Sequence, residues 1–132
     1  NFFISANAMV QQAGIAALKD AGNDVARMQK IYNERRLFMI RRLKELGFGI
    51  TVEPTGAFYV FANAAHISRD SYRLSLDLLA RARVACTPGI AFGENGEGYL
   101  RFSYANSLEN IEEGMNNHNH HRFGLLHLNK MN

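Results

Sequence analysis

The chain has 132 residues, 47% of them hydrophobic and 11% aromatic, with a formal net charge of +3. This length fits one domain with its own core, and the apolar content excludes disorder over most of the chain. The arginines are scattered and no apolar run reaches 18 residues, so we expect neither a nucleic-acid partner nor a membrane span. A single cysteine, Cys86, excludes an internal disulfide and agrees with a cytoplasmic protein. The chain begins at Asn1 inside an apolar phrase, which suggests a piece of a longer protein.

Two helices are expected in the first third of the chain. Ser5 or Asn7 can cap a helix that runs to about Lys19, because both side chains can accept hydrogen bonds from backbone N–H groups. A long helix follows over about 24–46, and Gly47 stands where a left-handed C-cap is needed. Its expected apolar stripe consists of Met28, Ile31, Tyr32, Met39, Leu43 and Leu46.

The remaining elements alternate between strands and helices. Strands are expected over 57–62, 84–87 and 98–105, a helix from Asp70 or Ser71 to about Ala82, and a last helix from Ser107. A turn at 88–89 favours positive φ at Gly89, and 93–98 reads as a flexible loop. The predicted fold class is α+β, in which an antiparallel or mixed sheet of three to four strands is covered by helices on one face and preceded by a long helix.

Arg101 is the main candidate for a binding residue. Side chains alternate along a strand, so Leu100, Phe102 and Tyr104 fall on a core face, whereas Arg101 falls on the other. A guanidinium is always charged, and its planar fork can bind a carboxylate through two hydrogen bonds. The alternative is a surface arginine whose stem only covers apolar area.

Other patterns indicate no site. The glycines at 93, 96 and 98 precede a strand rather than a helix, so they do not form a phosphate-binding loop. His118, His120 and His121 have no Cys, Asp or Glu to complete a metal site and stand in an Asn-rich tail. A nucleophilic lysine must be desolvated or lie beside a cation. The four lysines do not fit this requirement, since they occupy polar helix faces, helix ends or the tail: Lys19, Lys30, Lys44 and Lys130.

Three separated motifs carry a resemblance to a known family. They are Pro54–Phe61, Val84–Gly93, and the run from Glu97 to Ala105 with its continuation at 107–114. In this order and spacing the chain resembles the C-terminal small domain of class I/II aminotransferases, the fold-type I enzymes that use pyridoxal phosphate. The resemblance covers about residues 1–116, and Asn33 to Arg36 in the long helix fits it.

The resemblance implies roles for particular residues. Arg101 would bind the α-carboxylate of an amino-acid or 2-oxo-acid substrate, Phe58 would face the substrate channel, and residues 88–93 would lie near the pocket mouth. The Schiff-base lysine and the other cofactor-binding motifs of the family lie upstream of this region. The chain would therefore hold no catalytic, cofactor-binding or metal-binding residue and would not transaminate alone.

The resemblance also implies an organisation. Residues 1–115 would form the small domain, which closes over the large domain of a homodimeric parent enzyme, and residues 116–132 a divergent tail that is disordered or non-native. The sequence fits an engineered, a proteolysed and a natural fragment equally well. Which substrate side chain the parent enzyme accepts stays open. The alternative function is a small α+β interaction module that binds acidic partners or nucleic acid.

Overall fold

The computed structural model describes residues 5–116, so the predicted tail from residue 117 onward, with its three histidines, lies outside the described residues. The chain divides into two compact units, Asn1–Asn33 and Glu34–Asn132. Within residues 5–116, no helix combines the length and apolarity needed to cross a bilayer.

The first unit is helical. Helix α1 covers Ala8–Asp20, and Asn7 caps it because its side chain accepts a hydrogen bond from the Met9 N–H at 2.8 Å. This confirms one of the two predicted caps. Helix α2, Gly22–Glu45, begins directly after Ala21, so the predicted break between the helices is shorter than expected. No residue of α1 is buried.

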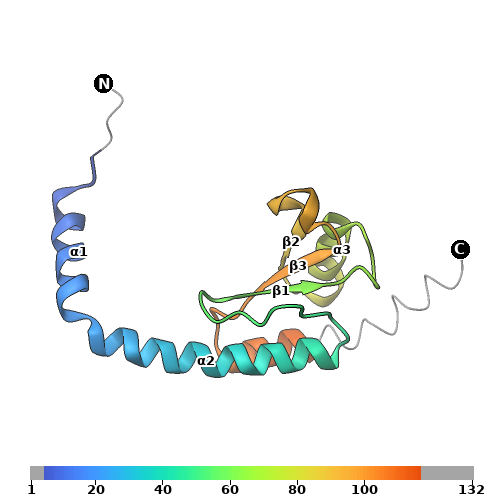
Figure 1. The fold of residues 1–132 in the computed structure, drawn as a ribbon, viewed down its shortest axis with the longest axis horizontal. Coiled ribbons are helices and arrows are strands. Elements are labelled where there is room, and N and C mark those ends of the chain that lie inside the picture. Colours follow the sequence, from blue (N-terminus) through green and yellow to red (C-terminus); the bar gives the residue numbers. More distant parts are fainter. Residues whose placement is uncertain (1–4, 117–132) are drawn as a thin grey trace, which may run out of the picture. The chain divides into compact units, whose positions relative to one another are not determined.

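The second unit contains a three-stranded antiparallel sheet (Figure 1). Its strands are β1, Tyr59–Asn63, β2, Thr87–Pro88, and β3, Tyr99–Ser103, with β3 in the centre. Aromatic residues are common in β1 and β3, as their fit to a pleated surface predicts. The α+β fold class and the early long helix are thereby confirmed, although β2 shares only Thr87 with the strand predicted over 84–87.

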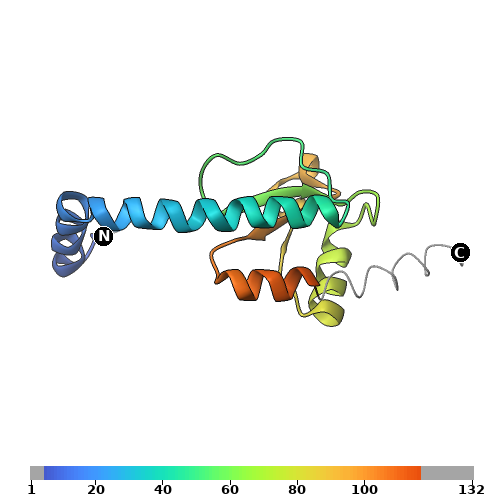
Figure 2. The same cartoon turned by 90° about the horizontal axis from the view of Figure 1, so that it is seen from below.

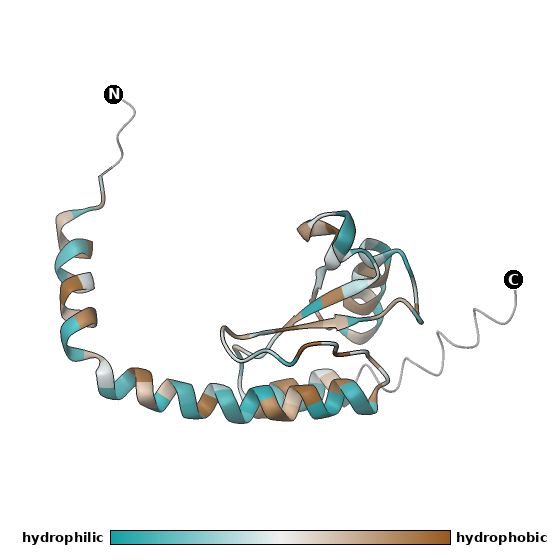
Figure 3. Ribbon diagram, in the orientation of Figure 1, coloured by the Kyte–Doolittle hydropathy of each residue, from teal (hydrophilic) through white to brown (hydrophobic). Residues whose placement is uncertain are grey.

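The core lies between one face of this sheet and two helical segments. Residues 34–45 of α2 and a helix over 108–116 run side by side along that face (Figures 1 and 2). Figure 3 shows apolar and polar residues alternating around α2, as in an amphipathic helix. The sheet and these helices bury Met39, Leu43, Leu46, Val60, Ala62, Leu100, Phe102, Tyr104, Ile111 and Met115.

The predicted stripe of α2 is therefore only partly correct. Met39, Leu43 and Leu46 are buried, whereas Met28 and Ile31 are 49% and 40% exposed. The two exposed residues belong to the first unit, whose described residues form no strand. Helical periodicity marked the apolar face correctly but could not show where the core ends along the helix axis.

Helix α3, Ser71–Asp77, begins at the predicted cap Asp70, whose carboxylate accepts from the Arg73 N–H at 2.8 Å. It continues as a π-helical turn over Leu78–Ala82, which ends at Arg83 in the left-handed conformation (φ 57°). Leu74 and Leu78 are buried, as their spacing predicts, but Leu79 is half exposed. The wider π turn shifts the residues that follow around the helix axis.

Two glycine predictions have opposite outcomes. Gly47 adopts φ 85° after α2, and the Phe48 N–H bonds the Leu43 carbonyl at 3.0 Å, so the left-handed C-cap is confirmed. Gly89 does not have positive φ, and that prediction is wrong. It is needed for another reason, because a Cβ there would lie 1.9 Å from the Gly96 carbonyl oxygen. A 3₁₀ turn over Gly89–Phe92 precedes the predicted flexible loop, and a second one, Glu94–Gly96, lies within it.

Candidate functional site

Arg101 lies on the face of β3 that points away from the core. Its neighbours Leu100 and Phe102 are 0% and 2% exposed, whereas Arg101 is half-buried. Arg101 pairs with Phe61 of β1 and with Thr87 of β2. Directly opposed residues share a face of an antiparallel sheet, so these three side chains lie together. The alternation predicted for this strand is confirmed.

The Arg101 guanidinium is held by one hydroxyl and two aromatic rings. Nη2 donates to Thr87 Oγ1 at 3.1 Å. The guanidinium carbon lies 4.2 Å from the centroid of the Tyr59 ring and 4.9 Å from that of Phe92, within the range of cation–π attraction. Within residues 5–116, no acidic side chain forms an ion pair with Arg101. Four of its five N–H donors therefore have no protein acceptor in the described chain, and the group is suited to bind an anion.

A pocket of about 420 Å³ opens in front of this guanidinium, and we call it the Arg101 pocket. Among the residues that line it, Arg101 carries the one charge, and the others are apolar or aromatic. The lining residues are Val52, Pro54, Tyr59, Phe61, Phe92 and Arg101. A small carboxylate with an apolar body matches this combination.

One wall of the Arg101 pocket is a loop that α2 holds in place. Arg36 Nη1 donates to the Pro54 carbonyl oxygen at 3.1 Å, and Lys44 Nζ donates to Glu53 Oε1 at 2.5 Å. The bond and the charge of Lys44 lower the pKa of the Glu53 carboxyl. These contacts join residues 18 and 9 positions apart in the sequence, and they fix the segment that carries Val52 and Pro54.

Another part of the wall, the segment that carries Phe92, is held by the N-terminus of α3. Ser71 Oγ, fully buried, accepts from the Ile90 N–H at 3.2 Å. Glu97 Oε1 accepts from the backbone N–H groups of Ser71 at 2.6 Å and Gly98 at 3.0 Å, and these bonds lower the pKa of Glu97. The hydrogen bonds of Ser71 and Glu97 thus fix both ends of the segment 90–98, which places Phe92 against the Arg101 guanidinium.

Phe58, the second residue predicted to contact substrate, lies just before β1 and outside the lining of the Arg101 pocket. It is 39% exposed, and its ring centroid lies 4.3 Å from that of Tyr59. Tyr59 thus contacts both Phe58 and the Arg101 guanidinium. The residue before it, Ala57, has φ 58°, and its carbonyl accepts from the Tyr104 hydroxyl at 3.1 Å.

Sequence reasoning did not single out Thr87 or Val52, and it included Phe92 only within the range 88–93. Thr87 could have been found from register, because β2 places it directly opposite Arg101. Val52 had no local signal, since its position depends on the contacts of Arg36 and Lys44 with the loop.

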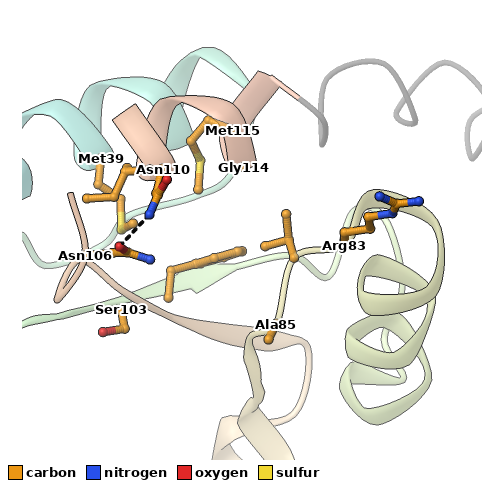
Figure 4. A pocket seen from close by; sticks show the side chains of 11 residues that line it. Met39, Arg83, Ala85, Ser103, Asn106, Asn110, Gly114 and Met115 are labelled. Atoms are coloured by element: carbon orange, nitrogen blue, oxygen red, sulfur yellow. Dashed lines mark hydrogen bonds between the residues drawn. The ribbon is translucent and has the colours of Figure 1, made fainter. Parts of the chain in front are cut away.

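A second pocket, of about 310 Å³, lies between the helix over 108–116 and the segment 83–85 (Figure 4). Asn110 Nδ2 donates to Asn106 Oδ1 at 2.9 Å at its rim. Arg83 stands apart from this pair, at the end of the π-helical turn (Figure 4). Apolar side chains and amides make up most of the remaining lining, and the described lining contains no His, Cys, Asp, Glu or Lys beside the Ser103 hydroxyl.

The lysines of the described chain do not fit a pyridoxal phosphate site. Lys19, Lys30 and Lys44 are exposed on helices, and Lys44 pairs with Glu53. None lines the Arg101 pocket. A Schiff-base lysine needs a desolvated setting, and the exposed side chains of these three lysines do not provide one. Over residues 5–116, no cluster of three His, Cys, Asp or Glu side chains could hold a metal ion.

Comparison with known proteins gives one consistent result. The family model described as aminotransferase class I and II matches residues 1–117. The aspartate aminotransferase of Pyrococcus horikoshii is 50% identical over 110 residues, which are 81% of this chain and 28% of that protein.

Solved structures agree. A Methanococcus jannaschii protein, whose active site is described as similar to those of kynurenine aminotransferases, superposes with a TM-score of 0.81 and 37% identity, covering 91% of this chain and 32% of that one. An aromatic aminotransferase from Pyrococcus horikoshii superposes with a TM-score of 0.71 and 42% identity over 75% and 26% of the two chains. The chain thus spans less than a third of the length of these relatives.

Proposed function

The chain belongs to the aminotransferase class I and II family, and from this premise we propose that residues 1–115 are the C-terminal small domain of such an enzyme. Residues 116–132 form a divergent tail in this proposal. The parent is a cytoplasmic homodimer that transfers an amino group between an amino acid and a 2-oxo acid. The extent of the family match, the α+β fold and the position of Arg101 support this assignment.

In this proposal Arg101 binds the α-carboxylate of the substrate. The observation that carries it is the half-buried guanidinium, oriented by Thr87 and two rings, with no acidic partner among residues 5–116. Pre-orientation reduces the entropy lost when a carboxylate forms paired hydrogen bonds with the fork. Phe58 lies beside Tyr59 and borders the channel through which substrate reaches Arg101.

The cofactor of the parent is pyridoxal phosphate, which supplies the electron sink of the reaction. The exposed lysines of the described chain do not fit its binding, so we place its anchor in the large domain, outside this chain. The small domain then contributes substrate positioning and exclusion of water as it closes over the large domain. Alone, the chain does not transaminate.

A chimera tests this role. Residues 1–115 replace the matching segment of the Pyrococcus horikoshii aspartate aminotransferase, to which the chain is 50% identical. The chimera should transaminate, and Arg101→Met should lower kcat/KM at least tenfold, since a charge-assisted hydrogen bond is worth about 1.5–3 kcal/mol. Arg73→Met, a change at an exposed arginine of α3, should leave kcat/KM unchanged.

An active chimera in which Arg101→Met has no more effect than Arg73→Met would refute the role of Arg101. An inactive chimera whose spectrum shows bound cofactor and whose circular dichroism matches that of the intact relative would refute the assignment of the domain.

A further inference from the structure

The walls of the Arg101 pocket leave large apolar side chains in contact with water. Phe61 is 39% exposed, Phe92 53% and Val52 77%. Phe61 is also fixed, because its ring stacks on that of Tyr99 with centroids 4.9 Å apart and meets Phe92 edge-on at 5.8 Å. A ligand that covers these rings removes apolar area from water, which is favourable.

The charges around the pocket favour a ligand with one carboxylate. Arg101 is the one charged residue of the described lining. The nearby cations of α2 are engaged with the loop, Arg36 with the Pro54 carbonyl and Lys44 with Glu53. A second carboxylate placed against Phe61 and Phe92 would lose water without gaining a partner, which is costly for a charged group.

The size of the pocket admits more than an anion. Its volume of about 420 Å³ lies within the range of small-molecule sites, about 300–1,000 Å³. The guanidinium occupies one part of the surface, over Tyr59 and Phe92, and the apolar side chains occupy the rest.

We propose that the Arg101 pocket selects monocarboxylates with an aromatic or branched apolar side chain over dicarboxylates. This inference rests on the proposed function of Arg101 as the carboxylate-binding residue. It adds that side-chain preference is encoded partly within this chain, by Phe61, Phe92 and Val52.

Binding to the full 132-residue chain tests the inference without cofactor or catalysis. Three probes are titrated by calorimetry: 3-phenylpropanoate, succinate and the neutral 3-phenylpropanamide. We expect 3-phenylpropanoate to bind at least tenfold more tightly than either of the others. Arg101→Met should weaken it at least tenfold, and Arg73→Met should not change it.

Variants of the apolar wall test the side-chain preference. Phe92→Ser should reduce the ratio of 3-phenylpropanoate to succinate affinity at least threefold, and so should Val52→Ser, whose exposed position makes misfolding a poor explanation. Circular dichroism checks that each variant is folded.

The outcomes separate the two proposals. If succinate binds as tightly as 3-phenylpropanoate and both depend on Arg101, the selection is refuted and the role of Arg101 stands. If the amide binds as tightly as the acid, or no probe binds in an Arg101-dependent way, both are refuted.

Discussion

The two faces of β3 differ in what their residues contribute. Leu100 and Phe102 are buried in the core, where any loss of volume leaves a cavity. Arg101, between them in sequence, faces the opposite side and contacts two rings and a hydroxyl at the edge of an open pocket. Within this five-residue strand, residues that stabilise the fold thus alternate with the residue that faces the pocket. Substitutions on the core face should therefore lower stability, and substitutions on the pocket face should mainly change binding.

The largest effect is expected at the core face. Leu100→Ala should lower the free energy of unfolding by about 2–5 kcal/mol, because it leaves a cavity in a fully buried site. Arg101→Met should change it by less than about 1 kcal/mol. Denaturant unfolding followed by circular dichroism measures both. Leu18→Ala, the same truncation at a 91% exposed position, is the control, with an expected change within about 0.5 kcal/mol. Equal losses for Leu100→Ala and Arg101→Met would contradict the separation.

A smaller effect is expected where the pocket face meets α3. Ser71→Ala removes the buried hydroxyl that accepts from the Ile90 N–H, and an unsatisfied buried donor costs about 1–3 kcal/mol. Unfolding should show this loss, and hydrogen exchange at Ile90 should become faster. Ser103→Ala, at an exposed hydroxyl, serves as the comparison and should have little effect. Unchanged exchange at Ile90 in Ser71→Ala would show that the network does not hold the loop.

The same network should respond to acid. The backbone N–H groups of Ser71 and Gly98 hold the pKa of Glu97 below its ordinary value of 4.5. A carboxyl with a lowered folded-state pKa stabilises the fold above its unfolded-state pKa, and this contribution is lost as the pH falls through the folded-state value. Glu97→Gln should therefore be less stable than the parent chain at pH 6–7, with a gap that narrows below about pH 5. Unfolding at several pH values measures the gap, and a constant gap would contradict the mechanism.

The smallest effect is expected at Ala57, which has φ 58° just before Phe58. An L-residue in this region costs about 1–2 kcal/mol, whereas glycine adopts it without a Cβ clash but loses more entropy on folding. Ala57→Gly should stabilise the chain by up to about 1 kcal/mol, and Ala57→Val should destabilise it. The unfolding temperatures of the two variants measure this difference. A lower unfolding temperature for Ala57→Gly than for Ala57→Val would show that the backbone at residue 57 changes conformation to accept the larger side chain.

Local signals in the sequence predicted much of the fold. Asp70 and Gly47 marked helix ends because their roles require only neighbouring backbone groups. Alternation around Arg101 predicted which side chains of β3 enter the core. These features involve residues within a few positions of each other, which is why composition and spacing revealed them.

Features that depend on distant residues were not predictable. The approach of Gly89 to Gly96 replaced an expected turn conformation, and the pairing of Arg36 with Pro54 placed a loop across the pocket. Met28 and Ile31 carry the right periodicity but lie beyond the end of the core. The candidate site combines both kinds of information, since Arg101 was predictable while most of its surroundings were not.

The single cysteine gives the chain a built-in reporter. Cys86 immediately precedes Thr87, and burial raises the pKa of its thiol to about 12, so almost no thiolate exists near neutral pH. Cys86 is partly exposed, so an added disulfide reagent can reach it, but the reaction should be slow until the second unit opens and the thiol regains its usual acidity. The rate of labelling would then report how often the sheet next to Arg101 opens, and a carboxylate bound at Arg101 should slow it.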